Sequence, residues 1–408
     1  MESKHCIVVG ASHAGTSLAL QVRKEGWEGR ITLVSDEAEL PYHRPPLSKE
    51  FLAGAKELND IRLRPEKVFK ANAIELLLGN KIVDLNCGTK RVLLADGTEL
   101  PYDKLALCTG ASPIALAAGV AMHGVHTIRS VADILLIKQG LQTAKTAVII
   151  GAGYIGLEAA AVLAKQGLDV TVLEMQSRVL ARVTSTTMSD YMESLHRDHG
   201  VKILTSTKVL SLEGESSVEV VVCEDGQRLP ADMVIVGIGV RPNIDLAVKA
   251  NLATGNGIVV NNHGQTSNAD VYAAGDCTSH PSALYGRNLR LESVHNANDQ
   301  SRVAASNICG IDKVYDAVPW FWSDQYDVKL QMVGLSEGFD QVVIRGDATN
   351  KAKTGFALFY FKEKRLIAAD CIARPKEFMA AKQLVMRKSE IAPELLMDES
   401  VEPVTFLA

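Results

Sequence analysis

The chain has 408 residues, of which 47% are hydrophobic and 22% charged, and its 43 basic and 48 acidic side chains give a formal net charge of −5. This is the composition of an ordinary globular protein, so collagen-like, disordered and disulfide-stapled classes are excluded. A slightly acidic chain also lacks the overall positive field that would attract nucleic acid or anionic lipid. The length predicts two or three domains, each large enough to bury its own core.

The seven cysteines are scattered through the chain, without a CxxC pair and without His or Cys at ligand spacing. This pattern weighs against a metal site, a dithiol motif and a disulfide framework. The N-terminal apolar run, residues 6–9, is too short for a signal peptide, and no later stretch reaches the roughly 18 apolar residues of a membrane-spanning helix. We therefore expect a cytoplasmic protein without a metal and without nucleic-acid or membrane partners.

Two segments repeat one pattern, in which a buried strand runs into a glycine turn, a helix and a second strand. The strands are predicted at 6–9 and 30–34 in the first segment, and at 147–150 and 169–173 in the second. The first turn contains Gly10, Ser12, His13, Ala14 and Gly15, and the second contains Gly151, Gly153, Tyr154, Ile155 and Gly156. Both segments have the form of the βαβ unit that opens a dinucleotide-binding fold.

The repetition continues downstream of each glycine turn. Residues 96–113 and 225–242 share Asp-Gly, Leu-Pro, Asp, Gly and Pro, all at one constant separation of 129 residues. This predicts two homologous modules, each closing with a hairpin and a strand that ends in glycine, Gly110 in the first and Gly239 in the second.

The rest of the chain divides into a short α/β stretch and a differently patterned C-terminal part. Strands are predicted at 258–260 and 271–276, the latter ending in Gly275-Asp276, followed by a helix at 297–309. From residue 314 onward the pattern is one of alternating strands with hairpin turns, at 329–333, 341–346, 356–361 and 365–371, and then of helices at 375–387 and 393–397. The predicted fold class is α/β, with two Rossmann-like domains (1–113 with 244–315, and 114–243) and a C-terminal α+β domain (316–408).

The second glycine turn matches the dinucleotide fingerprint Gly-x-Gly-x-x-Gly in full. Its glycines allow a tight turn, close approach of a pyrophosphate and packing of helix on strand, and the phosphates bind the helix N-terminus. Glu174 ends the second strand, where a carboxylate accepts a hydrogen bond from a ribose 2′-hydroxyl and repels a 2′-phosphate. This favours NADH over NADPH, although Arg178 and Arg182 lie just beyond and arginine can hold a 2′-phosphate.

The first turn departs from the fingerprint because Ser12 stands at the second glycine position. Its hydroxyl can still bond a phosphate oxygen, so we expect a nucleotide site there as well, with Asp36 as the ribose candidate; the alternative is a surface carboxylate after a strand. Two dinucleotide modules in one chain favour hydride transfer from a nicotinamide to a flavin.

Five further motifs resemble the FAD-dependent, NADH-using ferredoxin reductases that serve Rieske-type aromatic-ring dioxygenases. Rubredoxin reductases, putidaredoxin reductases and apoptosis-inducing-factor proteins are related to them, and all have a glutathione-reductase-like flavoprotein fold. The motifs are Tyr42–Lys49, Cys108–Ala111, Tyr272–Asp276, Glu292–Ala297 and Pro319–Asp324.

The resemblance implies that the first module holds FAD and the second holds NADH. It implies that Lys49 lies by the flavin N5, that Glu158 pairs with this lysine at the flavin–nicotinamide junction, and that Trp320 lies between flavin and protein partner. We expect Trp322 on the opposite face of the strand from Trp320, in the core. The implied FAD site comprises Gly10, Ser12, His13, Ala14, Gly15, Asp36, Arg44, Pro45, Lys49, Thr109, Gly110, Asp276, Val294 and Trp320. The implied NADH site comprises Gly151, Gly153, Tyr154, Ile155, Gly156, Glu174, Arg182 and Gly239.

The function expected from this resemblance is transfer of electrons from NADH through FAD to a small [2Fe–2S] ferredoxin, of Rieske or plant type, that docks transiently. Arg62, Arg64, Lys67 and Lys70 are candidates for steering that ferredoxin, the alternative being a solvated basic face. Other acceptors remain open, namely the ferredoxin of a P450 system or a rubredoxin, as does an NADH-gated binding protein of the apoptosis-inducing-factor type. A disulfide reductase or peroxidase would need a redox cysteine in residues 36–49, where none occurs. A flavin monooxygenase would need an organic-substrate pocket, which the sequence neither shows nor excludes.

Overall fold

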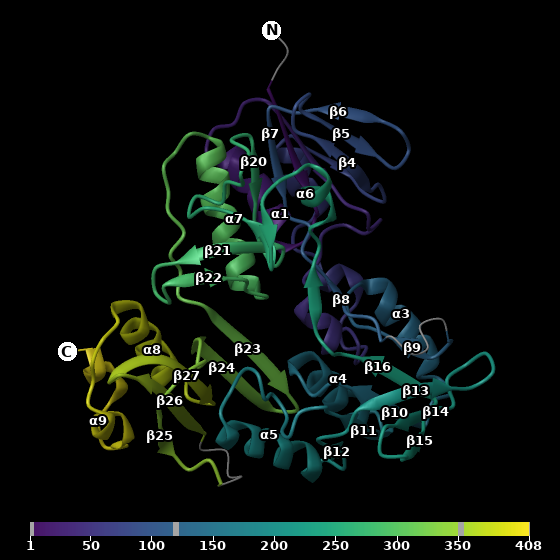
Figure 1. The fold of residues 1–408 in the computed structure, drawn as a ribbon, viewed down its shortest axis with the longest axis vertical. Coiled ribbons are helices and arrows are strands. Elements are labelled where there is room, and N and C mark those ends of the chain that lie inside the picture. Colours follow the sequence, from purple (N-terminus) through teal and green to yellow (C-terminus); the bar gives the residue numbers. More distant parts are fainter. Residues whose placement is uncertain (1–3, 117–121, 350–354, 408) are drawn as a thin grey trace. The chain divides into compact units, whose positions relative to one another are not determined.

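The computed structural model describes residues 4–116, 122–349 and 355–407 and divides the chain into two compact units. Unit 1 comprises residues 1–44, 58–112 and 241–319, and unit 2 comprises residues 45–57, 113–240 and 320–408 (Figure 1). The predicted three-domain division is finer than this two-unit division and stays a prediction.

Unit 1 is built on a five-stranded parallel sheet. The strands, in their order across the sheet, are β20 (Val271–Ala273), β7 (Lys104–Leu107), β1 (His5–Val9), β2 (Arg30–Val34) and β3 (Ile74–Leu77). Along β1 the side chains alternate between two cores: Cys6 and Val8 pack with the helices, and Ile7 and Val9 pack on the other face. This alternation is the two-residue period of a strand buried on both sides.

Helices α1 (His13–Lys24), α2 (Glu66–Ala71) and α7 (Val294–Ile308) cover one face of this sheet, and short strands together with α6 (Asp245–Lys249) cover the other. Unit 1 also contains the 3₁₀ turn Leu58–Ile61. The smaller sheets are β4 (Ile82–Asn86), β5 (Arg91–Leu94) and β6 (Glu99–Pro101), and β18 (Thr254–Gly255), β19 (Gly257–Val259), β21 (Thr278–Ser282) and β22 (Arg287–Leu289). Helix α7 begins at Val294, three residues before the predicted start, because Ser293 caps it by accepting from the Asn296 N–H.

The first part of unit 2 has the same design as unit 1. Its parallel sheet has the order β12 (Lys202–Leu204), β11 (Asp169–Leu173), β10 (Thr146–Ile150), β16 (Met233–Val236) and β9 (Val125–His126). Its helices are α3 (Val131–Gly140), α4 (Tyr154–Lys165), α5 (Thr186–Asp198) and the 3₁₀ turn Pro45–Ser48. An antiparallel meander follows, formed by β13 (Val209–Glu213), β14 (Val220–Cys223) and β15 (Arg228–Pro230), and the strands β8 (Ala111–Pro113) and β17 (Val240–Pro242) pair with each other.

The predicted duplication is confirmed down to single hydrogen bonds. Asp103 accepts from the His5 N–H at the start of β1, and Asp232, 129 residues on, accepts from the Lys145 and Thr146 N–H groups at the start of β10. Each aspartate thus ties the strand after its meander to the first strand of its module.

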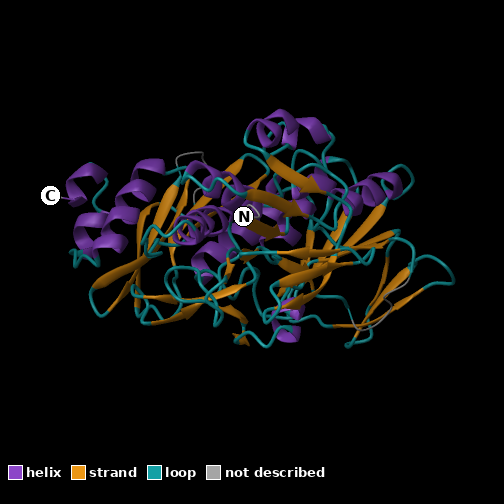
Figure 2. Cartoon of the chain, turned by 90° about the horizontal axis from the view of Figure 1, so that it is seen from above, coloured by secondary structure: helices purple, strands orange, loops and turns teal. Residues whose placement is uncertain are grey.

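The C-terminal part of unit 2 is a five-stranded antiparallel sheet with helices beside it (Figure 2). Its strand order is β23 (Trp320–Gln325), β24 (Val328–Gly334), β27 (Arg365–Ile372), β26 (Phe356–Lys362) and β25 (Gln341–Gly346). Its helices are α8 (Pro375–Arg387), α9 (Pro393–Met397) and the 3₁₀ turn Pro403–Leu407.

The expectation that Trp320 and Trp322 point to opposite faces of β23 is wrong. Residues two apart on a strand share a face, and the two indole rings lie 5.6 Å apart on the side where Phe378 of α8 contacts Trp320. The opposite face of β23 carries Phe321, Ser323 and Gln325, and its Phe321 ring lies 5.0 Å from the Tyr154 ring of α4.

Candidate functional site

Two glycines of the first turn are required by the backbone itself. A Cβ at Gly10 would lie 2.2 Å from the Cys108 carbonyl oxygen, and one at Gly15 would lie 1.8 Å from the Gly10 oxygen. Gly10 also has a φ of +100°, which L side chains rarely adopt. These contacts hold the turn closed at the carboxyl end of β1, directly before α1.

Ser12, between these glycines, is joined to Arg44 by a side-chain hydrogen bond. The Arg44 Nε donates to the Ser12 Oγ at 3.3 Å, and the same guanidinium donates to the Tyr42 hydroxyl and pairs with Glu37. The structure therefore brings Ser12 and Arg44 together, as a shared phosphate site requires. Asp36 is exposed, whereas Glu37 is half-buried beside Arg44. Glu37 was not singled out in the sequence, because Asp36 lies nearer the end of the strand. The only sign of Glu37 in the sequence is that it is a second carboxylate directly after Asp36.

The other predicted FAD residues of unit 1 gather at the carboxyl ends of β20 and β7. Asp276 follows β20 after Gly275, where a Cβ would lie 3.0 Å from the Ala14 side chain and 3.9 Å from that of Ala297 in α7. Thr109 and Gly110 follow β7, and Val294 opens α7. His13 is buried and its Nε2 lies 3.3 Å from the His43 Nδ1. Ligands of such sheets bind at this carboxyl edge.

The three glycines of the second turn differ in how closely other backbone atoms approach them. A Cβ at Gly151 would lie 2.5 Å from the Gly237 oxygen and one at Gly156 would lie 2.1 Å from the Gly151 oxygen, but one at Gly153 would meet nothing within 4 Å. The chain itself therefore does not need glycine at 153. An open backbone face at this position suits a close-approaching pyrophosphate.

The helix N-termini behind both turns also suit an anion. Neither Ser12 before α1 nor Gly153 before α4 makes a side-chain capping bond to its helix, and neither helix has an acidic residue in its first turn. First-turn N–H groups without a capping carboxylate, at the positive end of a helix dipole, attract phosphate. Both modules thus fit a dinucleotide.

The residues of the second module that were considered for binding the adenosine end of the coenzyme lie around the end of β11. The Glu174 Oε2 accepts from the Ala152 N–H of the glycine turn, and its Oε1 accepts from the Gln176 N–H, each at 2.8 Å. Arg178 is bound to Ser189 and to the Ala181 carbonyl. Arg182 lies at Gly239, where a Cβ would be 3.7 Å from its Nη2.

A buried ion pair in unit 2 joins the two residues that the resemblance places at the reaction centre. The Lys49 Nζ donates to the Glu158 Oε2 at 2.7 Å, and only 13% and 3% of these side chains are exposed. The Ser48 Oγ donates to the same oxygen at 2.5 Å, and the Ser323 Oγ donates to the Glu158 Oε1 at 2.6 Å. Ser48 and Ser323 were not predicted from the sequence, because a serine gives no sign of its partner.

Three further residues that were predicted to bind a cofactor, Tyr154, Ile155 and Pro45, lie in unit 2. Tyr154 opens α4 and donates to the Met332 sulfur at 2.7 Å; burial and nearby Asp370 raise the pKa of its phenol well above the usual value. Ile155 is 44% exposed. Pro45 begins the 3₁₀ turn before Lys49.

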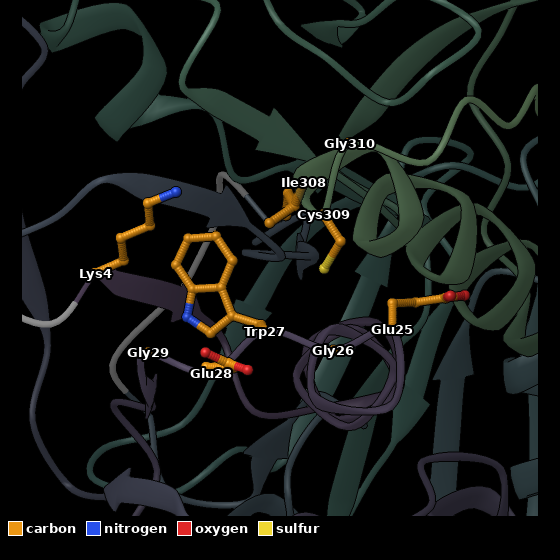
Figure 3. A pocket seen from close by; sticks show the side chains of 9 residues that line it. All are labelled: Lys4, Glu25, Gly26, Trp27, Glu28, Gly29, Ile308, Cys309 and Gly310. Carbon is orange, nitrogen blue, oxygen red and sulfur yellow. The ribbon is translucent and has the colours of Figure 1, made fainter.

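Unit 1 also has a surface hollow of about 720 Å³ that lies away from the glycine turn. Figure 3 shows Trp27 and Lys4 beside it, at the amino end of the sheet, where α1 and α7 end. Dinucleotides bind at the opposite, carboxyl edge of such sheets, so the hollow does not belong to the predicted site.

Within the described residues, no helix has the length and apolar character needed to cross a membrane. The cysteines are free, and Cys6, Cys108 and Cys277 are buried, which raises the pKa of each thiol.

Comparison with known proteins places this architecture in a family. Residues 4–301 match the pyridine nucleotide-disulphide oxidoreductase family, and residues 320–404 match the reductase C-terminal family. The chain is 43% identical over 402 residues to putidaredoxin reductase of Pseudomonas putida, covering 97% of this chain and 94% of the relative. It is 36% identical over 409 residues to the anthranilate 1,2-dioxygenase system ferredoxin–NAD(+) reductase component of Burkholderia cepacia, covering 100% of both. Its fold superposes with a TM-score of 0.96 on the covalent putidaredoxin reductase–putidaredoxin complex, at 41% identity over 100% of this chain and 99% of that one.

The chain therefore belongs to the pyridine nucleotide-disulphide oxidoreductase family. It is an oxidoreductase, and the cofactors that this membership implies, FAD and NAD(H), agree with the two dinucleotide modules predicted from the sequence.

Proposed function

We propose that the protein is an NADH-dependent, FAD-containing reductase that passes electrons to a small [2Fe–2S] ferredoxin. Support comes from its similarity, over almost the whole chain, to putidaredoxin reductase and to the anthranilate dioxygenase reductase component. The C-terminal match to the reductase family extends this support to the part of the chain that follows the two modules.

The observation that carries the proposal is the Lys49–Glu158 pair, in a chain whose family also includes enzymes that act on disulfides. A disulfide reductase needs an accessible thiol against the flavin, of low pKa. Residues 35–49 contain no cysteine, and burial raises the pKa of the thiols nearest the cofactor edge, Cys108 and Cys277. A buried lysine and carboxylate, without a thiol, suit hydride transfer to a flavin followed by electron transfer out of the protein.

FAD supplies the conversion of a two-electron donor to a one-electron donor. The residues of the chain have separate tasks. The first turns of α1 and α4 bind the two pyrophosphates, and Arg44 with Ser12 adds a cation and a hydroxyl at the first. Glu174 selects a ribose without 2′-phosphate. Lys49, oriented by Glu158, places a positive charge where negative charge develops on reduction.

The finer assignments belong to the same proposal. The downstream partner is an aromatic-ring dioxygenase whose ferredoxin is of Rieske or plant type and docks transiently. The location is the cytoplasm, which is consistent with cysteines that are free. Fractionation of the source cells would test the location.

The central experiment is rapid mixing of the purified yellow protein with NADH, followed by addition of candidate acceptors. Bleaching of the flavin by NADH and its reoxidation by a [2Fe–2S] ferredoxin are expected, with faster reoxidation by ferredoxin than by rubredoxin. A dithiol-specific substrate that reoxidises the flavin faster than any ferredoxin would contradict the proposal. Comparison of Rieske-type with plant-type ferredoxin identifies the acceptor type.

A further inference from the structure

The hydrogen bonds to Glu158 continue beyond Ser323 into the protein. Ser323 and Gln325 share one face of β23, the face toward α4, because they are two residues apart. The Gln325 Nε2 donates to the Ser323 Oγ at 3.0 Å, and the His196 Nε2 of α5 lies 2.8 Å from the Gln325 Oε1. The Tyr326 hydroxyl lies 3.3 Å from the His196 Nδ1. These four residues and Glu158 are called the Glu158 chain below.

Four of the five members of this chain are buried, and Tyr326 at its end is partly exposed. Glu158 is 3% exposed, Ser323 and Gln325 are 1% exposed, and His196 is 0% exposed. Buried polar groups are costly unless each one is bonded. Four connected groups of this kind are costly to retain for packing alone, which points to a role at the Glu158 carboxylate, where the chain ends.

One assignment of donors and acceptors gives every member of the Glu158 chain a hydrogen-bond partner. An ionised carboxylate only accepts, so the Ser323 hydroxyl must donate to it and must accept from Gln325. The Gln325 amide therefore presents its NH₂ to Ser323 and its oxygen to His196, which has to donate from Nε2. Burial lowers the pKa of His196 to about 4, so its ring is neutral at physiological pH and its Nδ1 accepts from Tyr326. If the Gln325 amide were turned round, its oxygen would compete with the Glu158 Oε1 for the single proton of the Ser323 hydroxyl.

We propose that Gln325 and His196 are positioning residues for Glu158, whose carboxylate this chain of donors holds in one orientation beside Lys49. The proposal deepens the proposed function, because it concerns the same reaction centre. Its physical basis is that, in a chain of buried hydrogen bonds, each bond fixes the direction of the next. Ser323 delivers the bond, and Gln325 and His196 fix the direction of the hydroxyl that makes it.

Other titratable groups also act on this carboxylate and on the histidine. Lys49 binds the other oxygen of Glu158, Oε2, and the Tyr154 phenol interacts with Glu158 and with Asp370. His196 is influenced by His199, which stacks on Tyr326, and Lys165 lies over that tyrosine ring. A test of the Glu158 chain must therefore alter Ser323, Gln325 or His196 while leaving these groups in place.

The test is infrared difference spectroscopy of the FAD-loaded protein at one fixed pH, in which the carboxylate stretching band of Glu158 is identified by its absence in Glu158→Gln. This readout is independent of turnover. In Ser323→Ala the band is expected to move from its wild-type position, because a hydrogen bond to the Glu158 Oε1 is lost.

The positioning residues are tested by pairs of variants. Gln325→Met and His196→Leu keep the volume but break the chain, and each is expected to move the Glu158 band in the same direction as Ser323→Ala, by a smaller amount. His196→Gln retains an N–H donor at the place of Nε2, so it should restore a band near that of the wild type. Ser189→Ala is the control: it removes a buried hydroxyl from the same helix, α5, that bonds Val179 and Arg178 instead, and it should leave the band unchanged.

An unchanged Glu158 band in Gln325→Met and His196→Leu would overturn the proposal. If these variants do not fold with FAD, Ser323→Ala decides, since an unchanged band in that variant would overturn the proposal equally. Failure of the proposed function would look different: the band would move as expected while no ferredoxin reoxidised the flavin.

Discussion

Glu158, in the second turn of α4, is 3% exposed and accepts hydrogen bonds from Lys49, Ser48 and Ser323. A carboxylate buried to this degree is tolerated because a cation and several donors surround it. The consequence for chemistry is that Lys49 is not a mobile surface lysine. Its ammonium is held in one place, where a fixed charge is most effective for catalysis.

Replacing Lys49 with alanine is expected to slow flavin reduction by NADH about 100-fold, because a fixed positive charge is lost where negative charge develops. Binding of NADH should weaken much less. Single-turnover stopped-flow over a range of NADH concentrations separates the two effects. Lys138→Met is the matched control, since this lysine contacts Phe51 of the same segment at 4.3 Å but does not touch Glu158 in the structure. A normal single-turnover rate in Lys49→Ala would remove the lysine from the mechanism.

Glu174→Ala is expected to raise the NADPH-to-NADH ratio of kcat/KM by about tenfold or more, since a contact between like charges costs over ~1.4 kcal/mol. The loss of its bonds to the Ala152 and Gln176 N–H groups acts on both coenzymes alike. Asp169→Ala removes a carboxylate from the other end of the same strand, β11, where it pairs with Lys202, and should leave the ratio alone. An equal preference in the wild type would already refute the role of Glu174.

At the scale of elements, strand β27 carries a second buried carboxyl group. The Asp370 Oδ2 accepts from the Thr184 hydroxyl, just before α5, at 2.5 Å and from the Tyr360 hydroxyl of β26 at 2.7 Å. Burial raises the pKa of Asp370 to about 6. The two donors tie α5 to the C-terminal sheet inside unit 2.

This raised pKa makes the stability of unit 2 depend on pH. The folded state holds the Asp370 proton more tightly than the unfolded state, so the stabilising contribution is full below about pH 4 and is lost as the pH rises through about 6. Asp370→Asn keeps an acceptor for both hydroxyls and has no proton to lose. Relative to the wild type, this variant should gain roughly 1 to 3 kcal/mol of unfolding free energy between pH 4 and pH 7.

Denaturant unfolding of both proteins at the two pH values measures this gain. Thr184→Val serves as the control, because it removes one donor and keeps the titrating group, so the pH dependence should persist. A stability difference between Asp370→Asn and the wild type that does not change with pH would show that Asp370 does not titrate in this range.

At the scale of the whole molecule, the electrons from NADH have to leave through the protein surface, because the acceptor is itself a protein and cannot enter a pocket. Trp320, at the start of β23, contacts Trp322, Phe378 and Lys382 at the C-terminal sheet. We propose that this ring lies between flavin and partner, where it would shield the flavin and shorten the path. Docking of this kind is transient, with a small contact area and electrostatic steering.

Trp320→Ala is expected to slow reduction of the ferredoxin roughly tenfold, a loss of ~1.4 kcal/mol, and to leave reduction of the flavin by NADH near normal. Trp322→Ala, the neighbouring ring on the same face, is the control and should affect neither step. In the wild type, rising salt should slow the ferredoxin step alone, because exposed charges such as Lys70, paired with Glu66 at 2.8 Å, are screened. A parallel fall of both steps in Trp320→Ala would mean that the ring acts as flavin packing.

The sequence by itself determined the two dinucleotide modules, their duplication and the family. The reason is that these features are local: a Cβ at Gly15 or Gly156 would strike the backbone oxygen of Gly10 or Gly151 in the same turn, and Gly10 and Gly151 have a positive φ that L side chains rarely adopt. Hairpins and strands of the C-terminal sheet were also predictable, since their turn residues and two-residue period are local signals.

Only the tertiary structure decided which side chains complete the site. The partners of Glu158 come from positions 48, 49 and 323, and hydrogen bonds between residues so far apart leave no trace in spacing. The same holds for His196 beside Gln325. A serine, glutamine or histidine has the same letter whether it faces water or a buried carboxylate, so its role depends on packing that brings distant elements together.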